Sequence, residues 1–341
     1  MRTAVYYAND DVRIEERPRP TIGEGELLLR VEASGICGSD VMEWYRKPRA
    51  PLVLGHEVAG VIEEAGRSVE GFRAGDRIVT THHVPCNRCR YCLTDRHNVC
   101  EMLHTTTFDP GGFAEFVRLP AVNVERGTFR LPGNVSFEEA SFVEPLACVV
   151  RAQRVAGLRA GDSVAVLGSG ISGLLQILQA RATGAARIFA TDTSDYRIKA
   201  ARALGADLAL QAGDDVEIRV LEANDGRGVD CVLVCTAARS AMLQALRLVD
   251  RGGTVLYFAP LAPGEELALP MNDLWKRGIS IVHSYAGPPA DMEAALDLIA
   301  GKRVDVVPMI THRLGLAETQ EGFRLTTRAD ESLKVIVEPQ R

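Results

Sequence analysis

The stretch that decides the fold runs Ser163-Val164-Ala165-Val166-Leu167-Gly168-Ser169-Gly170-Ile171-Ser172-Gly173. Its first five residues form a compact apolar run that predicts a buried β-strand. The apolar positions that follow repeat at the spacing of one helix face: Leu174, Ile177, Leu178 and Ala182. Gly184 then offers a natural C-cap. Strand, glycine-rich turn and helix in this order are typical of the first unit of a doubly wound α/β domain.

The glycines of this turn match the pattern G-x-G-x-x-G, and each has a separate physical role. Gly168 permits the tight turn, Gly170 lets the backbone approach a pyrophosphate, and Gly173 lets helix and strand pack closely. The helix begins at Ile171 and Ser172, where unpaired N–H groups and the positive end of the helix dipole suit a phosphate. Glycine-rich turns are common, but this one has the strand before it and the helix after it that the motif requires. We therefore predict a dinucleotide cofactor at this turn.

The choice between NAD and NADP depends on Asp192, at the end of the next predicted strand. It lies 192 − 173 = 19 residues beyond the last glycine, where a carboxylate accepts hydrogen bonds from the ribose hydroxyls and repels a 2′-phosphate. This position favours NAD. The alternative is that Asp192 merely caps the following helix. Arg197 is a second candidate cofactor contact and weakens the preference slightly, because a nearby arginine could accept a phosphate.

The rest of the chain divides into a β-rich part and this α/β part. Further compact apolar strands alternate with helix-length segments and predict a parallel sheet: 187–191, 229–235, 253–258 and 279–283. Short β-like runs punctuated by Gly and Pro come earlier: 26–31, 58–63, 77–80 and 113–117. A helix at 291–300 and a strand at 334–337 close the chain. We predict a catalytic β-rich domain over 1–148, a cofactor domain over 149–286, and a return to the first domain over 287–341.

Composition excludes several classes of protein. The chain has 341 residues with 46% hydrophobic and 25% charged residues, which is typical of a globular two-domain protein. The net charge is −6 and the sequence has no basic stripe, so no nucleic-acid partner is expected. The longest uncharged run, 163–180, is the strand–turn–helix unit, and no membrane partner is expected. The N-terminal residues lack a signal-peptide core, so we expect a cytoplasmic protein with reduced cysteines.

Four of the eight cysteines fall within fifteen residues: Cys86, Cys89, Cys92 and Cys100. Four thiolates complete the tetrahedral shell of a zinc ion and leave no open position, which predicts a structural zinc site. Four-cysteine loops also bind iron–sulfur clusters, and that chemical alternative stays open here. Ordinary buried cysteines are a poor explanation of two C-x-x-C spacings in tandem.

A second, dispersed set of residues has the donor types of a catalytic zinc site. It consists of Cys37, His56, Glu57 and Glu144. A mixed Cys/His/carboxylate set with three protein ligands leaves a fourth position for water or substrate. Each residue also has a non-functional explanation. Cys37 could be a small core residue, His56 a hydrogen-bonded structural histidine, and Glu144 a surface acid before a proline. Spacing along the chain cannot bring these residues together.

Five motifs together resemble the zinc-dependent medium-chain alcohol dehydrogenases, and most resemble their sorbitol (L-iditol) and threonine dehydrogenase branch. They are Gly35-x-Cys37-Gly38-Ser39-Asp40, Gly55-His56-Glu57-x-x-Gly60, the four-cysteine loop, Gly111-Gly112-Phe113-Ala114-Glu115 and Val143-Glu144-Pro145-Leu146. The resemblance covers nearly the whole chain in the right order. It implies a GroES-like catalytic domain interrupted by a Rossmann domain, two zinc ions per subunit, and a homo-oligomer, either tetramer or dimer.

The resemblance also assigns roles to residues. Cys37, His56 and Glu144 would ligate the catalytic zinc, with Glu57 beside it as an alternative ligand or a neighbour of the ligands. Ser39 matches the hydroxyl that hydrogen-bonds the substrate alcohol and would start a proton relay to solvent. Lys334 matches, more weakly, a basic position near the zinc site and cofactor.

The chain departs from the family at Met42, where many relatives have a proton-relay histidine, because a thioether cannot shuttle a proton. The segment between Cys37 and His56 is also shorter than in the polyol branch, so the substrate pocket should differ. Glu43 is a candidate for the missing relay and Tyr45 for the relay or the pocket. Trp44 and Arg46 are further candidate pocket residues, with an exposed turn as the alternative.

The expected reaction transfers a hydride between NAD and a secondary alcohol or polyol, with L-threonine and general alcohols as alternative substrates. A zinc-free quinone or enoyl reductase and a non-catalytic zinc- and dinucleotide-binding redox sensor are the competing classes. Of the remaining cysteines, Cys231 and Cys235 should lie near the cofactor, and Cys148 is expected to be a packing residue.

Overall fold

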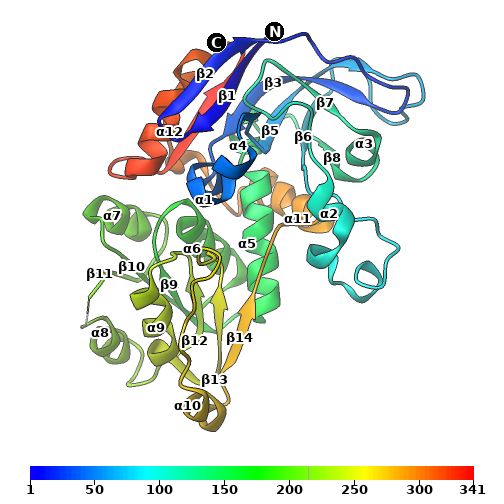
Figure 1. Ribbon diagram of the computed structural model, residues 1–341. Coiled ribbons are helices and arrows are strands. Elements are labelled where there is room, and N and C mark those ends of the chain that lie inside the picture. The colour runs from blue at the N-terminus through cyan, green and yellow to red at the C-terminus, as the bar shows by residue number, and fades with distance from the viewer. Residues whose placement is uncertain (214) are drawn as a thin grey trace. The chain divides into compact units, whose positions relative to one another are not determined.

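The computed structural model describes residues 1–213 and 215–341. The chain divides into two compact units, the first formed by Met1–Ala147 with Ala286–Arg341 and the second by Cys148–Tyr285 (Figure 1). Within the described residues, every helix falls short of the length and apolar character that a membrane crossing requires.

The first unit is built on two β-sheets. A seven-stranded sheet has the order β15-β16-β3-β5-β6-β8, with β7 paired to β3, and a three-stranded sheet has the order β2-β1-β4. The strands are β1 Arg2–Ala8, β2 Asp11–Glu16, β3 Leu27–Gly35, β4 Leu52–Val53, β5 Glu57–Ala65, β6 Arg77–Thr80, β7 Phe116–Leu119, β8 Thr128–Arg130, β15 Ile310–Gly315 and β16 Lys334–Glu338. The sheet therefore joins the two ends of the chain: β16 pairs antiparallel with β3 beside it (Figure 1).

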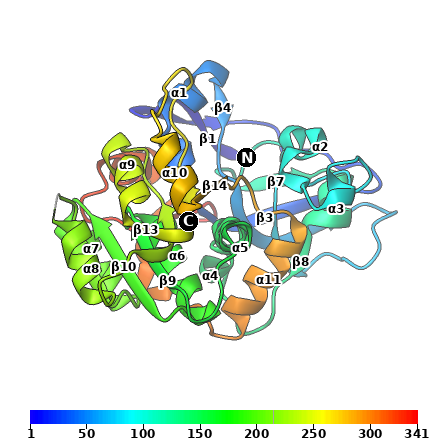
Figure 2. The ribbon, with the colours of Figure 1, turned by 90° about the horizontal axis from the view of Figure 1, so that it is seen from below.

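Short helices connect these strands: α1 Glu43–Arg46, α2 Glu101–Thr105, α3 Ala121–Gly127, α4 Phe137–Ala140, α11 Pro289–Ala300 and α12 Thr319–Arg328. Helix α11 contacts α4, although far from it in sequence (Figure 2). The Nδ2 of Asn134 donates to the carbonyl oxygen of Ala300 at 2.8 Å, and Lys302 pairs with Glu139 at 2.6 Å. These contacts attach the returning chain to the first unit.

The second unit holds one parallel sheet of six strands in the order β11-β10-β9-β12-β13-β14. Its strands are β9 Ser163–Leu167, β10 Arg187–Asp192, β11 Leu208–Gln211, β12 Val229–Val234, β13 Val249–Tyr257 and β14 Ser280–His283. Its helices are α6 Ile171–Thr183, α7 Asp195–Ala203, α8 Val216–Ala223, α9 Arg239–Leu248 and α10 Met271–Arg277, and α5 Val143–Ala156 leads into it. The order reverses at β9, so right-handed crossovers place α6 and α7 on one face and α8 and α9 on the other.

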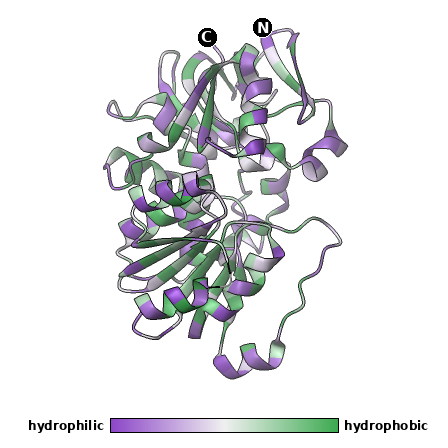
Figure 3. Cartoon of the chain, turned by 90° about the vertical axis from the view of Figure 1, so that its left-hand side faces the viewer, coloured by the Kyte–Doolittle hydropathy of each residue, from purple (hydrophilic) through white to green (hydrophobic). Residues whose placement is uncertain are grey.

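The apolar strands predicted from the sequence supply the core of this unit. Every residue of β9 is buried, and the strands are predominantly hydrophobic while the helices alternate (Figure 3). That is the pattern of a parallel sheet covered on both faces. Helix α6 ends where expected, with Gly184 as its C-cap at φ 93°. Its buried face differs from the predicted one: Leu174 and Ile177 are buried together with Leu175 and Ala180, whereas Leu178 and Ala182 are half-buried.

One predicted strand is displaced. The run at 113–117 was expected to form a strand, whereas β7 begins at Phe116. The backbone at Phe113 is used otherwise, because its carbonyl accepts from the N–H of Ala4 at 2.8 Å and its N–H donates to Leu54 at 2.9 Å. These bonds tie the segment before β7 to β1 and to the residue that follows β4.

Candidate active site and cofactor-binding turn

Cys37 lies directly after β3, at the start of a short 3₁₀ turn formed by Gly38–Val41. The Cys37 N–H donates to Oδ2 of Asp40 at 3.0 Å, and the Ser39 N–H donates to the Cys37 Sγ at 3.4 Å. Asp40 is fully buried. These two bonds fix the direction of the thiol, as a metal ligand requires.

His56 and Glu57 reach the same place from the neighbouring strand, because Glu57 is the first residue of β5 and pairs with Gly35 of β3. The Nδ1 of His56 lies 3.4 Å from Oδ1 of Asp40. Burial disfavours the charged imidazole, but the Asp40 carboxylate and the Cys37 thiol outweigh it and raise the pKa of His56 well above its ordinary value. The ligand atoms of Cys37, His56 and Glu57 all lie within 4.8 Å of one another.

Glu57 has a second partner in this cluster. The Nζ of Lys334 donates to Oε2 of Glu57 and, at 3.3 Å, to the carbonyl oxygen of Ile36. Both charged side chains are buried, at 0% and 1% exposed. Gly35 leaves room for this pair, since a Cβ there would lie 2.1 Å from Oε2 of Glu57. Lys334 therefore neutralises the carboxylate that stands beside Cys37 and His56.

Glu144, at the start of α5, falls in a different group. Its carboxylate lies within 4.8 Å of the ring nitrogens of His82 and His83. The two groups are neighbours, because the ring centroids of His56 and His82 are 4.9 Å apart. The donor types present (thiol, imidazole and carboxylate) are those of a catalytic zinc site with an open position.

The sequence interpretation did not include His82 and His83. They lie between β6 and the four-cysteine loop, and their rings are tilted by 34° with centroids 3.7 Å apart. Burial lowers the pKa of His82 well below its ordinary value and that of His83 to about 3, so both are neutral at physiological pH. Two adjacent histidines after a buried strand were the available signal for them.

The candidate pocket residues on α1 have different environments. Trp44 is 43% exposed and contacts Tyr45, with ring centroids 5.7 Å apart. Arg46 turns inward, and its Nη2 donates to the Oγ of Ser39 at 3.0 Å. Ser39, two residues after Cys37, thus contacts the Cys37 thiol through its N–H and the half-buried Arg46 guanidinium through its hydroxyl.

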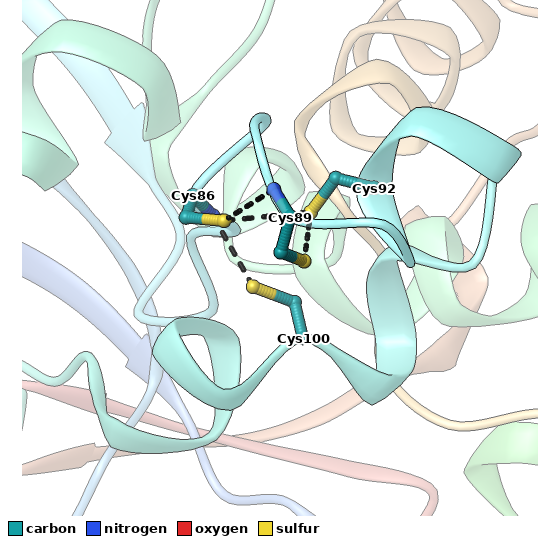
Figure 4. A group of neighbouring side chains, drawn as sticks. All are labelled: Cys86, Cys89, Cys92 and Cys100. Atoms are coloured by element: carbon teal, nitrogen blue, oxygen red, sulfur yellow. Dashed lines mark hydrogen bonds between the residues drawn. The ribbon is translucent and has the colours of Figure 1, made fainter.

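The four cysteines of the loop converge as predicted (Figure 4). The Sγ atoms of Cys86 and Cys92 are 3.9 Å apart, and those of Cys89 and Cys92 are 3.5 Å apart. A tetrahedron of sulfurs at a Zn–S distance of about 2.3 Å has edges of roughly 3.8 Å. An iron–sulfur cluster holds its cysteines on different irons and therefore further apart. The spacing fits a single ion.

The backbone of the loop also favours metal binding. Asn87 has a left-handed conformation with φ 57°, and the following N–H of Cys89 donates to the Cys86 Sγ at 3.2 Å. The N–H groups of Arg88 and Cys89 lower the pKa of the Cys86 thiol to about 6. A metal-binding thiolate is thus available there near neutral pH.

The glycine turn of the second unit has the predicted geometry. Gly168 has φ 91°, and a Cβ at Gly173 would lie 1.9 Å from the carbonyl oxygen of Gly168. Gly170 differs, because its φ is −70° and the nearest atoms to a Cβ there belong to the Arg197 guanidinium, at 3.7–3.9 Å. Neither its backbone nor its packing requires a glycine, which points to a ligand that must approach closely.

Asp192 ends β10 and is buried. Its Oδ2 accepts from the Ser169 N–H at 2.7 Å, and its Oδ1 accepts from the Ser194 N–H at 2.9 Å, at the N-cap of α7. The carboxylate thus links the glycine turn to the residue that precedes the first turn of the next helix. The buried Nε of Arg197 has no hydrogen-bond partner among the described residues. Unpaired donors beside a glycine turn fit a phosphate-bearing cofactor. Ile171 and Ser172 lie in the first turn of α6 and are half-buried.

Two of the other cysteines lie on the parallel sheet of the second unit or directly after one of its strands. Cys231 lies on β12 and Cys235 directly after it, and burial raises the pKa of each thiol to about 12.

The family model described as "Alcohol dehydrogenase GroES-like domain" matches residues 23–132, and the model described as "Zinc-binding dehydrogenase" matches residues 172–301.

Curated relatives match over nearly their full lengths. An L-threonine 3-dehydrogenase from Bacillus velezensis is 33% identical over 96% of this chain and 95% of its own. A sorbitol dehydrogenase from Gallus gallus is 32% identical over 98% of this chain and 95% of its own.

Solved structures share the whole fold. An alcohol dehydrogenase from Thermus sp. ATN1 superposes with a TM-score of 0.87 at 30% identity, covering 99% of each chain. A zinc-binding dehydrogenase from Sinorhizobium meliloti bound to NADP gives 0.89 at 30% identity, again covering 99% of each chain. The chain therefore belongs to the zinc-dependent medium-chain alcohol dehydrogenases, near their sorbitol and threonine dehydrogenase branch.

Proposed function

We propose that the protein oxidises a secondary alcohol or polyol with NAD⁺. The observation that carries this proposal is the mixed donor cluster of Cys37, His56 and Glu57, with the Ser39 hydroxyl two residues from the thiol. Such a set suits a metal that keeps an open position for a substrate oxygen. In the overall reaction the carbinol carbon gives a hydride to NAD⁺, and the hydroxyl proton passes to solvent, leaving a ketone.

Cys37, His56 and Glu144 are the proposed ligands of the catalytic zinc. Glu57 is the alternative ligand. Its ion pair with Lys334 supports a resting state in which Glu57 lies beside the metal without coordinating it. Zinc in such a site acts as a Lewis acid on the oxygen of the alcohol or ketone. Asp40 orients the imidazole of His56 and keeps its Nδ1 occupied, so that the other ring nitrogen is left for the metal.

The four-cysteine loop is proposed to hold a second, structural zinc, so that each chain binds two. Sulfur separations of 3.5 and 3.9 Å support a single tetrahedral ion. Because all four donors are thiols, no position stays open for a substrate.

NAD is the proposed cofactor, bound by Gly168–Gly173, Asp192 and Arg197. The oriented, buried Asp192 carboxylate favours ribose hydroxyls over a 2′-phosphate. Arg197, with its unpaired Nε, is proposed to contact the ribose or a phosphate of the bound dinucleotide. The helix dipole of α6 adds a favourable field for the pyrophosphate.

Polyols are the proposed substrates, because several curated relatives at 32% identity are sorbitol dehydrogenases. The relative named L-threonine 3-dehydrogenase, at 33% identity, makes L-threonine the second candidate. Ser39 is the proposed contact of the reacting oxygen, and the neutral pair His82 and His83 offers further polar groups near it.

We also propose a cytoplasmic homo-oligomer. Among the described strands β14 pairs only with β13, so it ends the parallel sheet. The neighbouring helix α10 exposes Trp275 at 79% and Met271 at 65%. An uncovered strand edge beside exposed apolar side chains is typical of an association surface. Sedimentation of the wild type against Trp275→Lys tests it, and a wild-type monomer would contradict the proposal.

The function is tested by NAD⁺ and NADP⁺ reduction with sorbitol, other polyols, L-threonine and simple secondary alcohols, with zinc measured on the same sample. The expected result is turnover of a secondary alcohol with NAD⁺ and two zinc ions per chain. Absence of turnover across the panel in a fully zinc-loaded protein would contradict the proposed function, and a preference for NADP⁺ would contradict the role of Asp192.

A further inference from the structure

Arg46 links three groups beside the metal-ligand cluster of the first unit. Its Nη2 donates to the Oγ of Ser39 at 3.0 Å and to Oδ1 of Asp40 at 3.3 Å, and its Nε donates to the carbonyl oxygen of Ser39 at 3.0 Å. The side chain is only 13% exposed, and its Cζ lies 4.6 Å from the ring centroid of Tyr45. Ring and acceptors together hold the guanidinium in one orientation.

This contact restricts what the Ser39 hydroxyl can do. A serine hydroxyl has one proton and two lone pairs, and Arg46 occupies one lone pair with a charged donor. Arginine cannot accept a proton in return. The proton of Ser39 is therefore directed away from Arg46, and polarisation along the chain of bonds makes the O–H a stronger donor.

The position three residues after Ser39 does not supply the relay group that many relatives have there. Met42, three residues later, has a thioether that cannot carry a proton. The Met42 N–H lies 3.4 Å from the carbonyl oxygen of Ser39 and so engages only the backbone. Met42 therefore cannot continue a proton relay from Ser39.

We propose that Arg46 is a positioning residue that fixes Ser39 as a hydrogen-bond donor to the substrate oxygen. The inference rests on the proposed function, in which Ser39 contacts that oxygen. Ser39 stabilises the negative charge that develops there during hydride transfer, in the manner of an oxyanion hole. The hydroxyl proton of the alcohol leaves to water by a route that does not cross Arg46.

A purely structural role for Arg46 makes a different prediction. Arg46 also neutralises Asp40, which holds His56, so its removal could act through the metal ligands instead. In that case the loss would appear as loss of zinc and would not depend on Ser39. The two roles are separated by measuring zinc content and by combining substitutions at Arg46 and Ser39.

The experiment measures calorimetric binding of 2,2,2-trifluoroethanol, an acidic alcohol used as the probe, to the zinc-loaded protein. The variants are Arg46→Gln, Arg46→Lys, Ser39→Ala and the double substitution Arg46→Gln/Ser39→Ala. Arg49→Gln is the matched control, because Arg49 lies over the same Tyr45 ring with its Cζ 4.8 Å from the centroid but is exposed. The kcat and KM for the best alcohol are measured beside binding.

Arg46→Gln is expected to weaken probe binding and to lower kcat about tenfold to a hundredfold, as for loss of a hydrogen bond to a charged group. Zinc content should not change in Arg46→Gln, and Arg49→Gln should match the wild type in probe binding and kcat. Arg46→Lys should give values between those of the wild type and Arg46→Gln. The double variant should match Ser39→Ala in both quantities within roughly twofold. Unchanged binding in Arg46→Gln, loss of zinc in parallel, or full additivity with Ser39→Ala would each overturn the inference. If the variants bind the probe in this pattern but the wild type oxidises no alcohol, only the proposed function is contradicted. If the wild type does not bind the probe, the inference is contradicted.

Discussion

In the proposed function, Asp192 is the residue that most directly sets the choice of cofactor. Its carboxylate is buried and held by the N–H groups of Ser169 and Ser194. Asp192→Asn keeps an acceptor oxygen but removes the negative charge that opposes a 2′-phosphate. We expect the ratio of kcat/KM for NAD⁺ over NADP⁺ to fall by about tenfold to a hundredfold.

The matched control for this substitution is Asp195→Asn, three residues later in the first turn of α7 and exposed. It removes the same charge without touching the glycine turn, and the ratio should change less than about twofold. Equal effects of the two substitutions would show that general charge, rather than contact with the ribose, sets the preference.

The buried pair Lys334 and Glu57 predicts a large stability effect. Lys334→Met leaves a buried carboxylate without its partner, and this costs about 3–5 kcal/mol. Replacing both, as Lys334→Met/Glu57→Gln, should recover most of that loss. Urea unfolding of wild type, both single variants and the double variant measures the coupling. A loss of unfolding free energy below about 1 kcal/mol in Lys334→Met is the size expected of a solvent-exposed ion pair, and it would contradict this prediction.

The residues of the site show how far a sequence can predict such a cluster. The four loop cysteines were identifiable because their donor type and spacing are restrictive. Cys37 and His56 are too far apart in sequence for spacing to group them, and their roles came from the resemblance of the surrounding motifs. The ion pair between Lys334 and Glu57 joins residues 277 positions apart, and no local pattern encodes that distance. The inward turn of Arg46 is also a packing result, since it depends on Asp40 and Tyr45 rather than on helical spacing.

At the scale of elements, helix α4 has a capping box that responds to pH. Ser136 Oγ accepts from the Glu139 N–H at 3.1 Å, and the Ser136 N–H donates to Oε2 of Glu139 at 2.9 Å. Burial raises the pKa of Glu139, but the bonds from Lys302 and Ser136 outweigh it and lower the net value. A carboxyl with a lowered pKa in the folded state stabilises the protein above its unfolded pKa of about 4.3.

Glu139→Gln should therefore lower the free energy of unfolding at pH 7 by about 1 kcal/mol. The difference from wild type should stay constant above the unfolded pKa of about 4.3 and shrink as the pH falls from there through the lower folded pKa. Urea midpoints across this range measure it, with the exposed Glu125→Gln as control. A difference that widens in acid would contradict the assignment.

The four-cysteine loop predicts a local effect of metal removal. Cys100→Ser removes one of four thiol ligands, so the protein should lose one of two zinc ions. The loop at 86–100 should then become sensitive to proteolysis, because few other contacts hold it: its apolar cluster is small and includes Cys92, Leu103 and Ala286. Mass spectrometry of limited digests locates the cuts. Retention of both zinc ions would contradict a four-thiol site.

Elements were more predictable than their ends. Strands β6 and β9 form over the predicted residues, because each is a short apolar run bounded by turn residues. Strand β3 extends to Gly35, beyond the predicted end at 31, because its last residues pair with β5 and β16. β7 is displaced to Phe116–Leu119 because the backbone of Phe113 bonds with other segments. Pairing partners set the ends of strands, and a single sequence does not contain them.

At the scale of the whole molecule, the main topological feature is that the first unit contains both ends of the chain. The first unit is completed by Ala286–Arg341, whose strand β16 pairs with β3 and carries Lys334 to Glu57. A chain cut before residue 286 would therefore lack the partner of a buried carboxylate. The alternation of apolar strands and helices predicted an α/β block within a β-rich chain, but not which strands the returning segment would join.

The measurement that tests the central claim most directly is zinc content and alcohol-dependent NAD⁺ reduction, compared between wild type and Cys37→Ser. The assignment of Cys37 to the catalytic metal and of the loop cysteines to the structural one predicts two zinc ions per chain in wild type. In Cys37→Ser it predicts one zinc ion, a folded protein and a loss of turnover of at least about a thousandfold. Full activity in Cys37→Ser with half the zinc would contradict the account.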